Sequence, residues 1–129
     1  MSTRLWTVDE ARAYLPRLRG LLAIIRQAAQ AMAAAQTNGH ATAGGAPEPD
    51  PGAKDVPEGL DAAGALAELE EQGVILRDPV RGLVDFPARH PSGRMVLLCW
   101  LAGEQDVAWW HLPEDGFAGR RPLPLPPEL

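Results

Sequence analysis

The first third of the chain has the hydrophobic spacing of a long amphipathic helix. Its apolar residues recur at alternating steps of three and four, which places them on one helical face: Val8, Ala11, Leu15, Leu18, Leu22, Ile25, Ala29 and Met32. Thr7 and Glu10 have the spacing of a capping box, in which each side chain bonds a backbone N–H at the helix start. We predict a helix over residues 7–36, kinked near residues 12–16 because Pro16 removes a helical hydrogen bond.

A loop and a second, shorter helix are predicted to follow the first helix. Residues 37–59 are rich in Gly and Pro and have no apolar period, which is typical of a flexible loop. Residues 61–72 again place apolar side chains on one helical face, and Gly73 follows as a candidate C-cap. Arg residues dominate the charge of the first helix, whereas the second carries only acidic charges, and we expect the two to pair as an antiparallel hairpin.

After Gly73 the pattern changes to that of β-strands. Short stretches rich in β-branched and aromatic residues predict four strands, at 74–76, 83–86, 95–100 and 107–111. The connections between them are short enough for antiparallel neighbours. The proline-rich residues 113–129 predict an irregular tail. The predicted fold is therefore one α+β domain, residues 1–129, with the helical hairpin packed on a four-stranded antiparallel β-meander at 74–112.

The composition indicates a globular protein and disfavours nucleic acid and membranes as its partners. A chain of 129 residues that is 46% hydrophobic and 22% charged has the size and balance of one globular domain. Its net charge of -5 disfavours binding to nucleic acid or to anionic membranes. The first helix has no apolar run long enough to cross a bilayer. A lone Cys99 and an N-terminus without an apolar leader favour the cytoplasm. No cofactor is predicted.

Several short motifs resemble one family. They are Arg81-Gly-Leu-Val-Asp-Phe-Pro87, Leu98-Cys-Trp100, Gly103-Glu104, Trp110-His111 and Gly116-Phe-Ala-Gly-Arg120, together with the N-terminal Thr7-Val-Asp-Glu-Ala11 and Leu15-Pro16. The chain thereby resembles, outside residues 37–59, a prokaryotic family known as domain of unknown function 2203. This resemblance implies a helical N-terminal part joined to a β-rich C-terminal part, and it implies no activity.

Polar residues on the predicted strands are the candidates for chemistry. Asp85 interrupts a strand, and the alternation of a half-buried strand favours a carboxylate facing solvent. The alternative is an acceptor for Arg81, Arg120 or Arg121. His111 ends the last strand beside two tryptophans, where we favour a packing role at the rim of the core over a role as metal ligand.

A zinc or iron site built from Cys99, His111, His90 and Asp85 is a second interpretation, although the chain has no paired ligand motif such as C-x-x-C. Cys99 and His111 share a face of the sheet if a five-residue loop pairs Leu101 with Val107, and a four-residue loop would separate them. The same register decides whether Cys99 could act as a nucleophile with His111 as its base.

Two functions therefore stay open, and so does the question of whether the protein is an enzyme. The first is a non-catalytic protein-interaction or self-assembly module that uses an aromatic wall of Trp100, Trp109 and Trp110 with a rim of Arg residues. The second is a small metal- or ligand-binding enzyme with a site around Asp85, His111 and Arg120. The second helix is too short to cover the first. We therefore expect a homodimer through the first helix, with Ile25, Ala29 and Met32 at the contact, and a different protein as the other possible partner.

Overall fold

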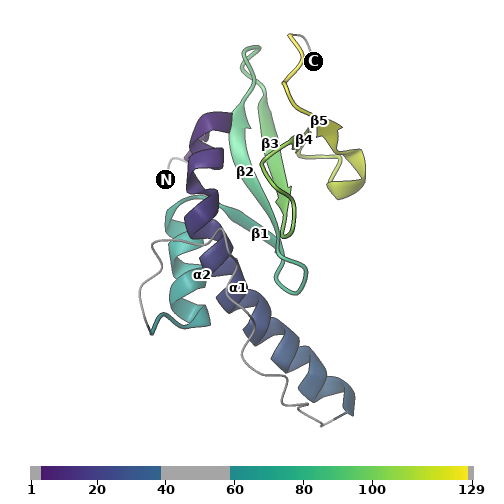
Figure 1. Cartoon of the computed structure of the whole chain (residues 1–129). Coiled ribbons are helices and arrows are strands. Elements are labelled where there is room, and N and C mark those ends of the chain that lie inside the picture. Colours follow the sequence, from purple (N-terminus) through teal and green to yellow (C-terminus); the bar gives the residue numbers. More distant parts are fainter. Residues whose placement is uncertain (1–3, 39–58, 128–129) are drawn as a thin grey trace.

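The structure is a computed structural model, and it describes residues 4–38 and 59–127. The prediction of a flexible loop at 37–59 falls almost entirely outside these residues. Within these ranges, two helices, five strands and one 3₁₀ turn follow one another (Figure 1). Their bounds are α1 Val8–Asn38, α2 Ala62–Glu71, β1 Ile75–Asp78, β2 Leu83–Arg89, β3 Met95–Leu101, β4 Trp109–His111, η1 Phe117–Gly119 and β5 Arg121–Pro122.

The strands form one antiparallel sheet in the order β1-β2-β3-β4-β5, which is the predicted meander with one strand more. The additional strand lies in the tail that was expected to be irregular. Pro122 pairs with Trp109, and Arg121 pairs with Trp110. A proline fits there because β5 is an edge strand, where a missing N–H need not interrupt a ladder. Residues 121 and 122 of the tail therefore pair with the edge of the sheet.

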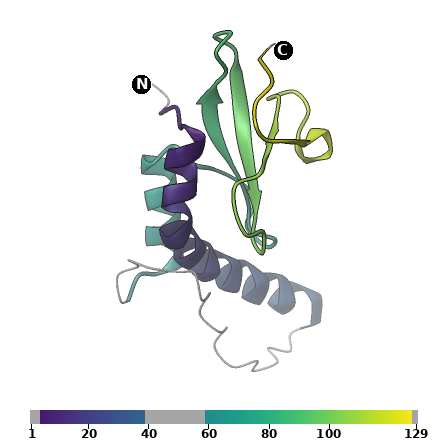
Figure 2. The same cartoon turned by 45° about the horizontal axis from the view of Figure 1, so that its top comes forward.

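The helix ends follow the predicted capping signals. Thr7 and Glu10 exchange bonds between side chain and backbone N–H at 3.0 and 3.1 Å, as a capping box requires. Asp61 caps α2 through the N–H of Gly64 at 2.9 Å. Gly73 has a positive φ of 74°, and it ends α2 with the paired backbone bonds of a Schellman motif. Figure 2 shows that the axis of α1, which contains Pro16, changes direction between its purple and blue parts.

The hydrophobic core lies between α1, α2 and one face of the sheet. The side of α1 from Ala11 to Ile25 is buried in it, together with Trp6, Leu69 and the strand residues Val84, Phe86, Val96, Leu98, Trp100 and Trp110. Ile25, which was expected at a dimer contact, is already 3% exposed within one chain. Met32 is 66% exposed. The homodimer stays a prediction, and its contact would have to lie beyond Ile25.

Three arginines at heptad spacing hold α1 against the loops of the sheet. They bind backbone carbonyls of these loops, although the opposite charges of the two helices had predicted pairing between α1 and α2. Arg12 donates to the carbonyl of Val107, Arg19 to those of residues 104 and 105, and Arg26 to that of Val80. The reason is geometric, since α1 crosses the turns, whose carbonyls have no partner in the ladder. Among these three and within the described residues, only Arg12 also approaches an acid, Asp106, at 3.6 Å.

The second face of the sheet is covered by the chain that follows β4. In both views α1 lies on one side of β2 and β3, and the yellow C-terminal segment lies on the other (Figures 1 and 2). β2 is buried at every position from Leu83 to Ala88, so both of its faces are shielded from water. No helix in the described ranges is long and apolar enough to span a membrane.

Candidate functional site

The register of the strands brings three chemically reactive side chains to the face opposite α1. Asp85 pairs with Cys99, and Cys99 in turn pairs with Trp109, so all three residues point to one side of the sheet. His111 follows Trp109 by two residues and points the same way. This register matches the five-residue loop that was predicted to unite Cys99 and His111. Asp85, Cys99 and His111 lie close enough that one possible ligand atom from each falls within 4.8 Å of the others.

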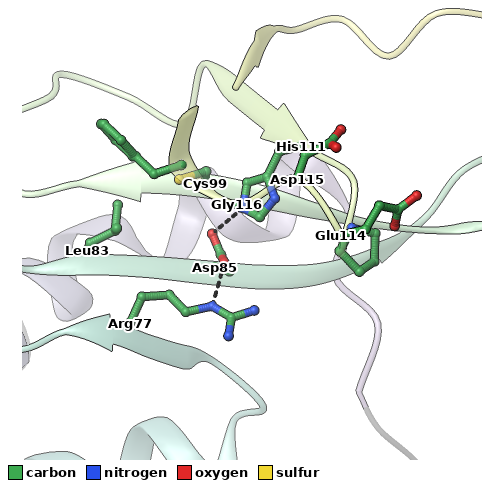
Figure 3. Close-up of a pocket in the computed structure, with 10 residues that line it drawn as sticks. Arg77, Leu83, Asp85, Cys99, His111, Glu114, Asp115 and Gly116 are labelled. Atoms are coloured by element: carbon green, nitrogen blue, oxygen red, sulfur yellow. Dashed lines mark hydrogen bonds and ion pairs between the residues drawn. The ribbon is translucent and has the colours of Figure 1, made fainter. Parts of the chain in front are cut away.

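Asp85 is the centre of this cluster. The expectation of a carboxylate facing solvent is wrong, because Asp85 is 1% exposed. Its Oδ1 lies 3.0 Å from His111 Nε2, and its Oδ2 accepts a hydrogen bond of 2.8 Å from Arg77 Nε (Figure 3). The arginines that we considered as partners all bind elsewhere. Asp85 and His111 come from β2 and β4, and their side chains meet above β3, which separates these strands.

Arg77 was missed by the sequence analysis, which placed it in a connection. It lies in β1 at the point where the pairing with β2 shifts by one residue, between the pairs Leu76↔Val84 and Asp78↔Leu83. Such a bulge re-aims a side chain, and bulges are frequent beside functional sites. Ile75 lies directly opposite Asp85, so alternation along β1 could have pointed to Arg77 as a neighbour on the same face.

His111 is buried, and both of its ring nitrogens face hydrogen-bond acceptors. Nδ1 lies 2.8 Å from the carbonyl oxygen of Leu112, and Nε2 lies 3.0 Å from Asp85 Oδ1. A neutral imidazole has only one N–H, so it can satisfy only one of these contacts. The backbone carbonyl can only accept, which assigns the hydrogen to Nδ1. The space between Nε2 and Asp85 therefore needs a cation, either a second proton or a metal ion.

His90 provides the contrast, and it does not join the cluster as one interpretation had it. Its Nδ1 accepts from the backbone N–H of Ser92 at 3.0 Å, and its Nε2 contacts the carbonyl of Pro126. One nitrogen accepts and the other donates, so a neutral ring satisfies both. His90 is buried as a structural residue that ties the tail to the β2–β3 turn.

Cys99 carries its proton in the metal-free protein. Burial, and after it the charge of Asp85, raise the pKa of Cys99 to about 12. Nucleophilic cysteines need the opposite shift, towards a thiolate at neutral pH. This environment argues against the nucleophile that the sequence left open. A bound metal ion would reverse the balance, because a coordinated thiol loses its proton to the metal.

A cavity of about 330 Å³ opens onto the cluster. Its floor is formed by Asp85, Cys99 and His111, and its walls include Arg77 and Leu83 and the chain from Pro113 to Phe117. The acidic side chains of this rim, Glu114 and Asp115, extend away from Asp85 in Figure 3, and Glu114 is paired with Arg94. The rim belongs to the tail, which was expected to be irregular.

The remaining predicted site residues lie outside this cavity. Trp100 and Trp110 are each 1% exposed and belong to the core on the α1 face. Trp109, the third tryptophan of the predicted aromatic wall, is half-buried on the opposite face. Arg120 does not contact Asp85. It binds Glu104 at 2.6 Å, and its guanidinium lies 5.0 and 4.8 Å from the ring centroids of Trp109 and Phe117. The interaction-module hypothesis keeps only Trp109 of its three tryptophans at the surface, and it stays a prediction.

No curated protein and no solved structure is detectably similar to the chain. A family model described as "Uncharacterized conserved protein (DUF2203)" matches residues 4–123. This range includes both helices, the sheet and every residue of the buried cluster. The chain belongs to this uncharacterised family, as its motifs had indicated.

Proposed function

We propose that this protein binds a divalent transition-metal ion, of which zinc fits best, through Cys99 Sγ, His111 Nε2 and Asp85 Oδ1. The observation that carries the proposal is the double acceptor environment of His111. With Nδ1–H directed at the Leu112 carbonyl, the lone pair of Nε2 points at a carboxylate oxygen that would repel it. A metal ion between the two converts both into ligands.

The surroundings of His111 support a metal ion over a second proton. Histidines that bind metals commonly donate their other ring N–H to a backbone carbonyl or carboxylate, which fixes the tautomer and the ring orientation. The Leu112 carbonyl takes this place at 2.8 Å. A second proton would instead be shared between His111 Nε2 and Asp85 Oδ1, and it would leave the neighbouring thiol without a role.

The donor set indicates the class of metal. Thiolate and imidazole ligands suit zinc and related transition metals, and magnesium and calcium prefer sites built from oxygen alone. Asp85 adds one hard oxygen, because its other oxygen is held by Arg77. Sites with three protein ligands leave a fourth position for water or substrate, whereas structural zinc sites use four protein ligands. The cavity that Asp85, Cys99 and His111 line would give such a ligand access to the ion. A reduced thiol also suits the cytoplasmic location that we propose for the chain.

The test is the metal content of protein stripped with a chelator and reloaded with zinc or cobalt. We expect about one ion per chain, a thiolate-to-cobalt charge-transfer band in the near ultraviolet, and release of the Cys99 proton on binding. Cys99→Ala and His111→Gln should each weaken binding by more than about 100-fold, since each removes a ligand. His90→Gln is the matched control, because it alters a buried histidine outside the cluster. Circular dichroism verifies that each variant is folded.

Two results would overturn the proposal. The first is a folded wild-type chain that takes up no ion. The second is an ion whose affinity is the same in Cys99→Ala and His111→Gln as in the wild type. In either case Asp85, His111 and Arg77 form a buried ion-pair network that has a structural role only.

A further inference from the structure

Asp85 holds two cationic partners on its two oxygens. Oδ2 accepts from Arg77 Nε at 2.8 Å, and Oδ1 faces His111 Nε2, where the proposed metal ion binds. The ion and the guanidinium would then be bridged by one carboxylate, on one wall of the cavity. A second carboxylate could bridge the same two groups from the cavity side, with one oxygen on the ion and the other on Arg77.

Arg77 has donors left for such a ligand. Its hydrogen bond to Asp85 uses Nε, and within the described part of the chain no hydrogen bond uses its two terminal nitrogens. The side chain is 46% exposed and lines the cavity. In Figure 3 the terminal nitrogens point away from Asp85. A guanidinium binds planar carboxylates well because its N–H groups form a fixed fork.

The charge of the loaded site also favours a monoanion. A divalent ion and Arg77 together carry three positive charges, and the Cys99 thiolate and Asp85 compensate two of them. His111 is neutral as a metal ligand. Of the two acidic side chains at the rim, Glu114 is paired with Arg94, and both Glu114 and Asp115 extend away from the cluster, so neither is counted at the ion. One positive charge is left between the ion and Arg77, and a bound monoanion would compensate it.

The cavity indicates the size and character of this anion. Its volume of about 330 Å³ lies at the lower end of the range for small-molecule sites. Leu83, Pro113 and Phe117 give it apolar walls beyond the charged floor. We infer that the ligand of this site is a small organic carboxylate with a short apolar body, bound jointly by the metal ion and Arg77. This inference rests on the proposed metal site.

The test uses cobalt-loaded protein at fixed pH, with the visible spectrum of the ion as the readout. Propionate is the probe, and propionamide, which has the same shape without the charge, is the control ligand. We expect propionate to change the cobalt spectrum with a saturable midpoint and propionamide to leave it unchanged. Arg77→Met should raise the midpoint for propionate at least about tenfold. Arg89→Met, which removes an exposed arginine at the end of the same sheet face, should leave it within about twofold.

This experiment distinguishes a failure of the proposed metal site from a failure of the proposed carboxylate ligand. If no cobalt binds, the metal site itself is wrong. If cobalt binds with its thiolate band but propionate leaves the spectrum unchanged, the metal site stands and the carboxylate ligand is wrong. The inference is also wrong if Arg77→Met binds cobalt and propionate as tightly as the wild type. Should Arg77→Met fail to fold, the comparison of propionate with propionamide on the wild type decides alone.

Discussion

Strands β2 and β3 present one face to α1 and the other to the chain from Pro113 to Phe117, and the two faces differ in chemistry. The α1 face is apolar, with Val84, Phe86, Val96, Leu98 and Trp100 in a continuous core. The opposite face buries Asp85 and Cys99 beside His111. Burial of apolar side chains stabilises a fold, whereas burial of a carboxylate costs free energy unless every partner is in place. The α1 face therefore stabilises the fold, whereas the opposite face carries the residues of the proposed metal site.

The largest effect should come from breaking the polar face at its centre. Asp85→Ala leaves Arg77 and His111 without their acceptor and should lower the free energy of unfolding of the metal-free protein by about 3 to 5 kcal/mol. The double substitution Asp85→Val, His111→Leu removes the charges from both sides and should recover most of this loss while abolishing metal binding. Urea denaturation measures both. A double variant as unstable as the single one would show that the cluster is needed for folding.

The apolar face should respond to truncation without any rescue. Leu98→Ala and Leu22→Ala, at residues that are 0% and 1% exposed, should each cost about 2 to 5 kcal/mol. Neither should change the number of metal ions bound per folded chain. Met32→Ala is the matched control at an exposed position and should cost less than about 0.5 kcal/mol. A loss under about 1 kcal/mol at Leu98 in denaturation experiments would contradict its place in the core.

A smaller effect should come from the contact between the helices. Glu68 accepts from Tyr14 at 2.7 Å and from Arg17, and the hydrogen bonds from Arg17 lower the pKa of Glu68. Glu68→Gln should cost about 1.5 to 3 kcal/mol at pH 7. A lowered pKa stabilises the fold above the ordinary value of about 4.5, and this contribution is lost as the pH falls through the folded value. The exposed Glu70→Gln is the control. Equal acid stability of the two variants and the wild type would argue against the ion pair.

The smallest effect concerns the alkaline stability of the metal-free protein. Burial raises the pKa of Cys99 from 9.0 to about 12, so the folded chain keeps a proton that the unfolded chain releases. Stability should therefore fall as the pH rises above about 9, and Cys99→Ala should remove this part of the slope. Tyr14, whose pKa burial also raises, contributes in the same direction above about 10. A slope unchanged in Cys99→Ala at pH 9 to 10 would show that the thiol is not shielded.

The sequence predicts much of the apolar α1 face of the sheet and little of the polar face opposite it. The capping box at Thr7 and the helical spacing after it depend on neighbours in sequence, and these predictions were confirmed. The turn of residues 102–106 was left open between two loop lengths, and the structure has the register of the five-residue loop. The burial of Asp85 was not predicted because alternation of polar and apolar residues indicates a solvent-facing carboxylate only if one face of the strand is exposed to solvent. The nearly continuous apolar run of β3, Met95–Leu101, is typical of a strand buried on both faces and could have corrected this.

The partners of Asp85 depend on contacts that no local pattern determines. Arg77 reaches it through an irregularity in the pairing of β1 with β2, and a bulge cannot be located without the register. The segment from Pro113 to Phe117 lines the cavity over the cluster. It is held there because the chain after it forms β5, which pairs with β4 at only two positions, and so short a strand is hard to predict from sequence. Sequence analysis therefore identified Asp85, Cys99 and His111 as candidates but could not assemble the cavity around them.

The most direct test of the account is anomalous X-ray scattering from crystals of zinc-loaded protein, measured on either side of the zinc absorption edge. The account predicts one strong peak bonded by Cys99 Sγ at about 2.3 Å, by His111 Nε2 at about 2.0 to 2.1 Å and by Asp85 Oδ1 at about 2.0 to 2.2 Å. It predicts no peak at His90. A peak located elsewhere, or no peak while His111 Nε2 still contacts Asp85 directly, would contradict the central claim that the polar face of the sheet is a metal site.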